Sequence, residues 1–350
     1  MEENFWMKRT TLKDLARSLE LTEGTVSRAL NGYSDISLRT VERVQAAAQQ
    51  LGYKPNQNAR RLATGVAEAV AYVIPQNHSS LAEPFVSQLL QGLDESVSAR
   101  GWDLLVSHSQ SAEDESEKIQ KLISSGRVGG VLLTRPFRND ARIKLLQQAG
   151  FPFVVHGRSA ESDDYAWYDI DSELAITTAV LYLLELGHER IAFIGAPLFY
   201  NFAYQRLEGY KAALEQRFIP YDSSIVEIIE MRDDAAESAA SNLLDSNNPP
   251  TAFVCVSDMQ ALGVLAAIRT RGLVAGVDVS VIGYDGLNIG RHANPPLTTM
   301  AQPQVQSGRE LGDMLLAVID GDEPARHQVL KRAELVLRNT AGPVRDRKYH

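Results

Sequence analysis

One short segment near the N-terminus carries side chains that could read the edges of DNA bases. Arg28 can donate two parallel hydrogen bonds to guanine O6 and N7, and Glu23 can accept one from cytosine N4. The short polar side chains around them suit phosphate oxygens, which position a protein on a duplex. The candidate DNA-contacting residues are Thr22, Glu23, Gly24, Thr25, Ser27, Arg28 and Asn31. A generic three-helix bundle with a polar surface fits the same helical pattern.

The elements around this segment have the spacing of a helix-turn-helix. Thr11 can cap a first helix with one apolar face, and Thr22 can cap a second after a tight connection. Ser37 can cap a third helix, which ends before Pro55. The first 55 residues therefore predict three short helices, of which the second would lie in the major groove.

From residue 69 onward, short β-rich runs alternate with helical stretches. The runs include AVAYVIP from residue 69, TAFVCVSD from residue 251 and DVSVIGYD from residue 278. Candidate helices lie over Glu113–Ser125, Leu174–Leu186 and Met259–Arg271. Such alternation is typical of βαβ units with parallel sheets. The sequence has at least eight such β-rich runs from residue 69 onward. Because one compact sheet of this type usually holds fewer strands, we expect two α/β subdomains.

Composition and charge narrow the class of protein. The single cysteine, Cys255, the lack of a long apolar run and the acidic residues near Met1 favour a cytoplasmic protein without a membrane span. The formal net charge is −9, yet residues 1–65 carry ten Lys and Arg against seven Asp and Glu. A cationic head on an acidic body suits DNA binding. The histidines lack metal-ligand spacing and no catalytic motif is present, so we expect no metal, no cofactor and no enzymatic activity.

The run from Thr11 to Gly65 closely resembles the DNA-binding head of the LacI/GalR family of repressors. The matching pieces are TLKDLA, TVSRALN, RTVERV, LGYKPN and ARRLA, and one departure is Glu20, where the family turn usually has glycine. Residues 69–340 resemble the core that this family shares with periplasmic sugar-binding proteins, through LLELGHERIAFIGAP, RLEGYKAALE and PPLTTMAQP. The resemblance implies an all-α helix-turn-helix domain followed by an α/β two-lobed periplasmic-binding-protein-like domain with parallel sheets.

The same resemblance implies how the chain is divided. The implied divisions are 8–56 for the helix-turn-helix domain, 57–66 for a hinge helix and 67–343 for a ligand-binding and dimerisation domain. Within the last domain, the implied N-lobe comprises 67–169 and 300–328, and the implied C-lobe comprises 171–297 and 332–343. In the hinge helix, Leu62 matches the leucine that the family wedges into the minor groove. Arg60 and Arg61 would neutralise nearby phosphates. An ordinary linker is the alternative.

Side chains at the ends of the predicted strands are candidates for a ligand site between the lobes. By the resemblance, Asp285 accepts hydrogen bonds from ligand hydroxyls or ring nitrogens, and Arg206 reaches the same ligand. An aspartate at a strand end can instead cap a helix, and Arg206 could form a structural ion pair with it. The candidate effector-binding residues are Phe85, His108, His156, Arg158, Asp171, Tyr200, Phe202, Arg206, Ser257 and Asp285.

These features predict a transcriptional regulator that responds to a ligand. We expect a two-fold homodimer on a near-palindromic double-stranded operator, since one head reads only a half-site. Tyr200 and Phe202 stand where purine-responsive members of the family place other residues, and carboxylates with an arginine suit the hydroxyls of a sugar. The expected function is repression of sugar uptake or catabolism genes, relieved by a small sugar. A corepressor-type regulator that senses a nucleobase or another metabolite is the alternative.

Overall fold

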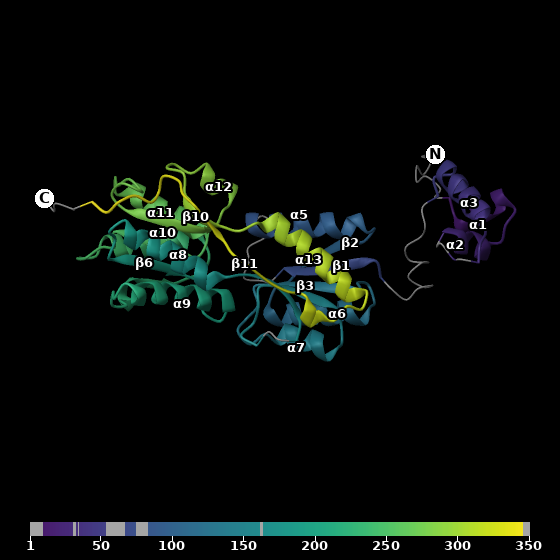
Figure 1. The fold of residues 1–350 in the computed structure, drawn as a ribbon, viewed down its shortest axis with the longest axis horizontal. Coiled ribbons are helices and arrows are strands. Elements are labelled where there is room, and N and C mark those ends of the chain that lie inside the picture. The colour runs from purple at the N-terminus through teal and green to yellow at the C-terminus, as the bar shows by residue number, and fades with distance from the viewer. Residues whose placement is uncertain are drawn as a thin grey trace, which may run out of the picture. The chain divides into compact units, whose positions relative to one another are not determined.

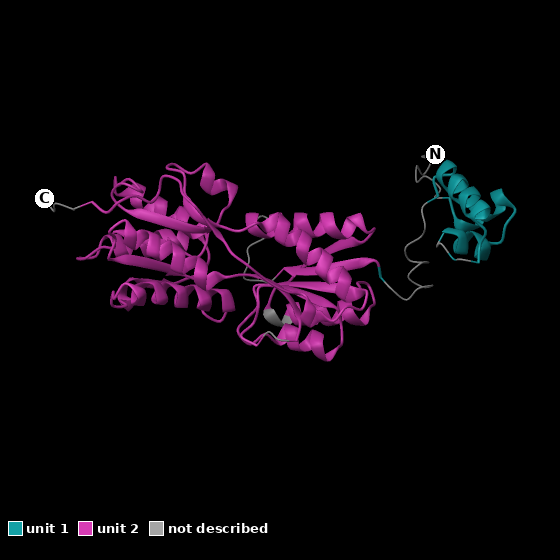
Figure 2. Cartoon of the chain, in the orientation of Figure 1, with its two compact units in different colours: residues 1–67 teal, residues 68–350 magenta. Residues whose placement is uncertain are grey.

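The computed structural model describes residues 10–30, 33, 35–53, 67–74, 83–161 and 164–345. The chain separates into two compact units, residues 1–67 and residues 68–350 (Figure 2). The predicted hinge helix over 57–66, with its Arg60, Arg61 and Leu62, lies outside the described residues, and so does Asn31. Within the described part of the chain, no helix combines the length and the apolar character needed to cross a bilayer.

Unit 1 is built from short helices with a shared apolar core. Its helices are α1 (Leu12–Leu19), α2 (Glu23–Leu30) and α3 (Leu38–Gln50). Leu15, Val26 and Val44 are fully buried where the three helices meet. Each helix buries residues three or four positions apart, which is the spacing of one helical face.

The predicted N-terminal caps of these helices are confirmed. Thr11 Oγ1 accepts a hydrogen bond from the Asp14 amide at 3.2 Å, and Thr22 Oγ1 accepts one from the Thr25 amide at 3.1 Å. Ser37 Oγ caps α3 in the same way. Glu20 ends α1 in the left-handed conformation, with φ of 57°, which explains why glycine is favoured at this turn.

Unit 2 contains two sheets, which we name the N-lobe sheet and the C-lobe sheet. The N-lobe sheet has the strand order β11-β5-β4-β3-β1-β2, and the C-lobe sheet has the order β12-β10-β9-β8-β6-β7. Neighbouring strands run parallel except for the antiparallel pair of β10 and β12. The strands are β1 (Ala69–Ile74), β2 (Asp103–His108), β3 (Gly130–Thr134), β4 (Phe153–His156), β5 (Ala166–Ile170), β6 (Ile191–Gly195), β7 (Val226–Ile228), β8 (Ala252–Cys255), β9 (Ser280–Asp285), β10 (Thr298–Ala301), β11 (Gln328–Lys331) and β12 (Glu334–Val336).

Helices cover both faces of each sheet (Figure 1). The principal helices are α5 (Pro84–Ala99), α13 (Gln304–Ile319), α6 (Ala112–Ser124) and α7 (Ala141–Gln148) in the N-lobe, and α8 (Ser172–Glu185), α9 (Asn201–Gln216), α10 (Asp233–Leu244) and α11 (Asp258–Thr270) in the C-lobe; the short elements are α12 (Asn288–Arg291), η1 (Ser223–Ile225) and η2 (Pro324–Arg326). Successive side chains of β1 point to opposite faces of the N-lobe sheet. Tyr72 packs in the core under α5 and α13, whereas Ala71 and Val73 pack in the core under α6 and α7.

Within the described residues the chain passes between the two sheets three times. The passages follow β5, follow β10 and separate β11 from β12. Because β10 belongs to the C-lobe sheet and β11 to the N-lobe sheet, the second and third passages lie a few residues beyond the lobe limits at 297, 300 and 328 that the sequence implied. This connectivity lets segments far apart in the sequence meet between the lobes.

Candidate effector pocket and DNA-reading helix

The predicted DNA-contacting residues that the structure describes lie on the outer face of α2 and just before it. Val26 and Ala29 are buried on the opposite face of the helix, in the core of unit 1. The outer residues are Thr22, Glu23, Gly24 and Arg28, which are exposed, and Thr25 and Ser27, which are half-buried. The start of α2 thus presents a continuous polar surface, as a helix entering the major groove requires.

Arg28 is engaged within unit 1 rather than extended into solvent. It forms an ion pair with Asp35, and its guanidinium carbon lies 5.6 Å from the centroid of the Tyr33 ring. Both side chains of the ion pair are about half exposed, so water screens their attraction, and such pairs contribute roughly 0–1 kcal/mol. Arg28 can therefore exchange Asp35 for a guanine edge at a small free-energy cost.

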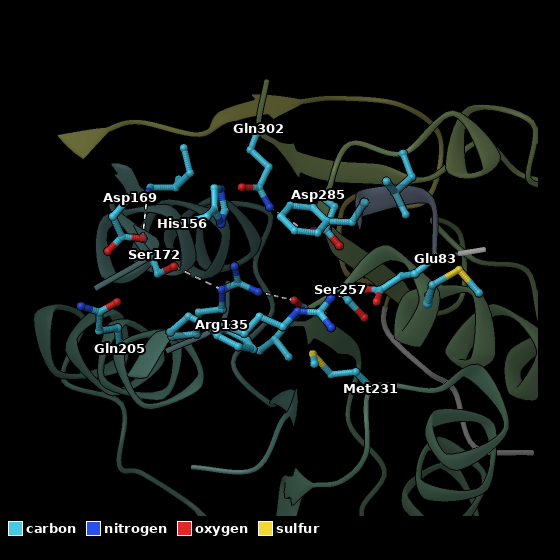
Figure 3. Close-up of a pocket in the computed structure, with 18 of the residues that line it drawn as sticks. Glu83, Arg135, His156, Asp169, Ser172, Gln205, Met231, Ser257, Asp285 and Gln302 are labelled. Atoms are coloured by element: carbon cyan, nitrogen blue, oxygen red, sulfur yellow. Dashed lines mark hydrogen bonds and ion pairs between the residues drawn. The ribbon is translucent and has the colours of Figure 1, made fainter. Parts of the chain in front are cut away.

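A cavity of about 530 Å³ lies between the two lobes of unit 2 (Figure 3). Its walls come from the carboxyl ends of β3, β4 and β5 in the N-lobe and of β8 and β9 in the C-lobe, where open parallel sheets bind ligands. The N-terminal parts of α5 and α9 and residues 230–233, which lead into α10, also contribute to the walls. The predicted effector residues that line it are Phe85, His156, Arg158, Phe202, Arg206, Ser257 and Asp285.

Asp285 is fixed in the C-lobe wall by side chains that follow β10. Gln302 Nε2 donates to Asp285 Oδ1 at 2.7 Å, and Gln304 Nε2 donates to the Asp285 carbonyl oxygen at 2.5 Å. The φ of Asp285 is 118°, a backbone conformation that costs free energy in any residue with a side chain. The hydrogen bonds from Gln302 and Gln304 hold Asp285 in this conformation and so fix its carboxyl at the edge of the cavity.

Asp258 lies behind Asp285 and changes its chemistry. Burial, and then the negative charge of Asp258, raise the pKa of the Asp285 carboxyl well above its ordinary value. Asp258 accepts hydrogen bonds from Thr299 Oγ1 at 2.6 Å and from the Leu287 amide at 2.7 Å, which favour its charged form. Of the two carboxyls, Asp285 is therefore the one that holds a proton more readily near neutral pH.

Arg206 lies across the C-lobe side of the cavity and is only 7% exposed. Its Nη1 donates to the Val256 carbonyl oxygen at 2.5 Å, and its guanidinium carbon lies 3.5 Å from the Tyr284 ring centroid and 4.7 Å from that of Phe202. Among the described residues, Arg206 hydrogen-bonds to the Val256 carbonyl oxygen and Ser172 Oγ rather than pairing with Asp285, and Leu287, not Asp285, is the cap residue of α12. Asp285 therefore neither caps a helix nor forms a structural ion pair with Arg206, the two roles other than ligand contact that the sequence left open.

His156 ends β4 in the N-lobe wall and is 8% exposed. Its ring meets Phe85 edge-on at a centroid distance of 5.4 Å and stacks near Tyr168 at 6.2 Å. Burial, followed by the positive charges of Arg135 and Arg206, lowers the pKa of His156 to about 4. The imidazole is therefore neutral at physiological pH.

Ser257 and Arg158 line the cavity with part of their hydrogen-bonding capacity already used. Ser257 Oγ caps α11 by accepting from the Gln260 amide at 3.2 Å. Arg158 Nε donates to Asp169 Oδ2 at 2.9 Å. Burial raises the pKa of Asp169 to about 6 despite this partner. Both pairs position polar groups at the edge of the cavity.

Three predicted effector residues do not line the cavity. Asp171 turns to cap α8, where its Oδ1 accepts from the Leu174 amide at 3.0 Å. Tyr200 is 4% exposed and packs among aromatic rings, with the Phe199 centroid 4.5 Å away. His108 is exposed at the end of β2, which is an edge strand. Capping, core packing and an edge position explain why these residues lie elsewhere.

Nine polar lining residues are absent from the set predicted from the sequence: Glu83, Arg135, Asp169, Ser172, Gln205, Glu230, Arg232, Asp233 and Gln302. Arg135 forms an ion pair with Glu83, the residue before α5, as Figure 3 shows. Arg135 and Asp169 also stand at strand ends, so the signal used for Asp285 was available for them. Gln302 enters from the segment after β10, and the quoted run PPLTTMAQP contained it.

The lining combines carboxyl, amide, guanidinium and imidazole groups with aromatic rings, a set suited to reversible binding of a polar small molecule. Among the described residues, no group of three or more His, Cys, Asp or Glu side chains is arranged to hold a metal ion. Cys255 is fully buried within β8, as a core-filling residue would be. The chemistry of the cavity is thus hydrogen bonding and ring packing.

Comparison with known families and proteins matches both units. Residues 11–56 match the family described as bacterial regulatory proteins, lacI family, and residues 180–341 match a periplasmic binding protein-like domain. The regulator AglR of Rhizobium meliloti (strain 1021) is 36% identical, with 96% of this chain and 95% of AglR covered. The regulator CelR of Thermobifida fusca is 33% identical, with 95% of this chain and 98% of CelR covered.

Solved structures show the same likeness. A complex of the transcriptional regulator CelR with cellobiose has a TM-score of 0.73 and 32% identity, covering 95% of this chain and 100% of that one. A Lac repressor dimer bound to operator and the anti-inducer ONPF has a TM-score of 0.82 and 28% identity, covering 95% and 99%. Both likenesses extend over nearly the whole chain.

Proposed function

Because the chain belongs to the lacI family of bacterial regulatory proteins, we propose that it represses genes of sugar uptake or catabolism and leaves its operator when a small uncharged sugar fills the interlobe cavity. The observation that carries the proposal is the cavity itself, whose lining combines Asp285, Gln302 and Arg206 with the aromatic rings of Phe85 and Phe202. Carboxyl and amide groups accept and donate to hydroxyls, and the rings cover the C–H faces of a sugar.

Membership of the family settles the broader predictions. The resemblance and the fold predicted from the sequence are confirmed, and the chain is a ligand-responsive DNA-binding regulator. The prediction that it is not an enzyme is confirmed as well, since its relatives are transcriptional regulators. The sugar, the homodimer, the near-palindromic operator and the cytoplasmic location stay predictions.

The balance of charge in the cavity supports an uncharged ligand. The described lining residues include four guanidinium groups and five carboxyl groups. The raised pKa of Asp285 makes it the carboxyl that is protonated most readily. When Asp285 is protonated, the four positive charges of the lining are balanced by four negative charges. These charged residues are Arg135, Arg158, Arg206 and Arg232, with Glu83, Asp169, Glu230, Asp233 and Asp285. A phosphorylated sugar or a nucleotide would add negative charge to a cavity without spare positive charge.

The test is release of the full chain from DNA taken from upstream of its own gene and of neighbouring genes. Fluorescence anisotropy at low ionic strength follows the complex while cellobiose, maltose, D-glucose, glucose 6-phosphate, cytidine or adenine is added. We expect at least one neutral sugar to release the chain and glucose 6-phosphate to have no effect. Release or tighter binding with only a nucleoside or nucleobase would contradict the proposal and favour the corepressor alternative. Footprinting and sedimentation test the palindrome and the dimer.

A further inference from the structure

Each lobe presents the cavity with an aromatic ring beneath a guanidinium group. In the C-lobe, the Arg206 guanidinium carbon lies 4.7 Å from the centroid of the Phe202 ring. In the N-lobe, the Arg135 guanidinium carbon lies 5.7 Å from the centroid of the Phe85 ring. We name these pairs the C-lobe subsite and the N-lobe subsite. In each pair the ring offers an apolar edge to the C–H groups of a sugar, and the guanidinium over its face offers nitrogen donors to the hydroxyls, so each pair suits one sugar unit.

The C-lobe subsite already has defined hydrogen bonds around it. Asp285 accepts from Gln302 Nε2 at 2.7 Å, and Arg206 donates to the Val256 carbonyl oxygen and, at 3.3 Å, to Ser172 Oγ. These bonds fix the carboxyl and the guanidinium before a ligand arrives. The first unit of an effector would therefore meet preorganised groups here.

The N-lobe subsite has polar atoms that lack partners. His156 and Arg135 both line the cavity, and His156 Nε2 and Arg135 Nη1 are buried without a hydrogen-bond partner among the described residues. His156 is 8% exposed, and its ring contacts Phe85. Burial keeps the pKa of His156 at about 4, so its ring is neutral and can exchange a hydrogen bond with a hydroxyl. Buried polar atoms in native proteins are normally paired, so these two point to a ligand group as the missing partner.

We propose that the effector has two sugar rings, with Asp285, Gln302 and Arg206 binding one ring and Phe85, Arg135 and His156 selecting the other. This inference rests on the proposed function and adds that the N-lobe subsite distinguishes a disaccharide from its component monosaccharide. Because the subsites come from different lobes, a two-ring ligand is the kind that contacts both lobes at once. A single ring would satisfy one subsite and leave the other without a partner.

Titration calorimetry of the full chain with cellobiose, maltose, trehalose and D-glucose tests the inference. We expect one of the disaccharides to bind at least 10-fold more tightly than glucose. Glucose binding as tightly as every disaccharide would overturn the inference while leaving a sugar effector in place. Absence of binding by all four sugars would overturn the proposed function together with the inference.

Substitutions in the N-lobe subsite locate the selectivity. Phe85→Leu and His156→Phe should each weaken disaccharide binding at least 10-fold and change glucose binding less than twofold. Phe153→Leu is the matched control for Phe85→Leu, since both phenylalanines are 6% exposed in the N-lobe and Phe153 does not line the cavity. The control should lose thermal stability to a similar extent and keep full disaccharide affinity. Equal loss of glucose and disaccharide affinity in both subsite variants would refute the role of the N-lobe subsite.

Discussion

Two buried clusters of charge in unit 2 are built in opposite ways. The first, which we name the N-lobe triad, comprises Glu115, Asp140 and Arg142. Arg142 donates Nη1 to Glu115 Oε1 at 2.6 Å and its Nε and Nη2 to the two Asp140 oxygens at 3.0 and 2.6 Å. Side-chain exposure is 5% or less for all three residues. Every charge in the triad thus meets an opposite charge.

The effector cavity has the same kinds of groups but leaves some of them without a partner of opposite charge. Asp285 is bonded to an amide rather than a cation, and Arg206 to a carbonyl and a hydroxyl rather than a carboxylate. His156 Nε2 and Arg135 Nη1 have no partner in the described structure. Burial and charge are therefore common to both clusters. The cavity differs because Arg135 and Arg158 have carboxylate partners, whereas Arg206 and Asp285 are hydrogen-bonded to neutral groups. A closed network stabilises the fold, whereas an open one keeps hydrogen-bonding capacity for a ligand.

Opening the N-lobe triad should have the largest effect on stability. Asp140→Ala removes the bidentate partner of Arg142 and the cap of α7, which leaves a buried guanidinium with one carboxylate. Loss of one partner from a buried pair costs about 3–5 kcal/mol. Urea unfolding should show this loss, while sugar affinity changes less than twofold because the triad does not line the cavity.

Asp245→Ala is the matched control for burial. Asp245 also binds an arginine through both oxygens, with Arg271 Nε 2.8 Å from Oδ1, but the Asp245 side chain is 65% exposed. An exposed pair contributes roughly 0–1 kcal/mol. A loss after Asp245→Ala as large as that after Asp140→Ala would show that burial does not separate the two pairs.

Asp285→Asn should separate binding from stability. The amide keeps the shape and can still accept from Gln302 Nε2, but the hydroxyl oxygen of a protonated carboxyl can both donate to and accept from a sugar hydroxyl, whereas the amide nitrogen can only donate. We expect the affinity for the releasing sugar to fall about 100-fold, or about 2.7 kcal/mol at 1.36 kcal/mol per decade. The raised pKa of Asp285 means that its stabilising contribution is present at low pH and is lost as pH rises.

The stability of the Asp285→Asn variant should therefore change in the opposite direction from its affinity. Asparagine does not titrate, so the variant should have a higher Tm than the wild type, and the gain should be larger at pH 8 than at pH 5. Calorimetry at the two pH values measures the gain, and titration with sugar measures the affinity. If the variant had a lower Tm than the wild type at pH 8, the ionised Asp285 carboxyl would not destabilise the folded protein, and the prediction would be wrong.

The contrast also explains what the sequence could predict. The caps Thr11, Thr22 and Ser37 depend on neighbours three residues away, so local pattern was sufficient for unit 1. Asp285 and Arg206 stand in continuous motifs of the C-lobe and were found by resemblance and strand-end position.

The N-lobe wall was harder to predict because its members depend on pairing across the fold. Arg135 reaches Glu83, which is 52 residues away. On the C-lobe side, Gln302 likewise arrives from a distant segment, the one after β10. Asp171 and Asp169 both lie near the end of β5, yet a local cap takes Asp171 away from the cavity while Asp169 lines it. Strand-end position predicts where a side chain starts, whereas capping and partner choice decide where it points.

The smallest effect concerns the open imidazole of His156. Its pKa of about 4 lies below the ordinary 6.5, so its contribution to stability is complete above pH 6.5 and is lost as pH falls toward 4. Between pH 7.5 and pH 5 this group alone should cost the wild type about 2 kcal/mol, whereas His156→Phe avoids that cost. The charged groups that act on the ring are Arg135 and Arg206, both permanently protonated.

Comparing urea unfolding of wild type and His156→Phe at the two pH values isolates this contribution. Asp169 and Asp285 have raised pKa values and act in the opposite direction, but they are present in both proteins and largely cancel in the comparison. The wild type should therefore lose about 2 kcal/mol more than the variant on going from pH 7.5 to pH 5. Equal losses would mean that the imidazole is solvated or hydrogen-bonded. His156 would then resemble the fully paired residues of the N-lobe triad rather than an unpaired group.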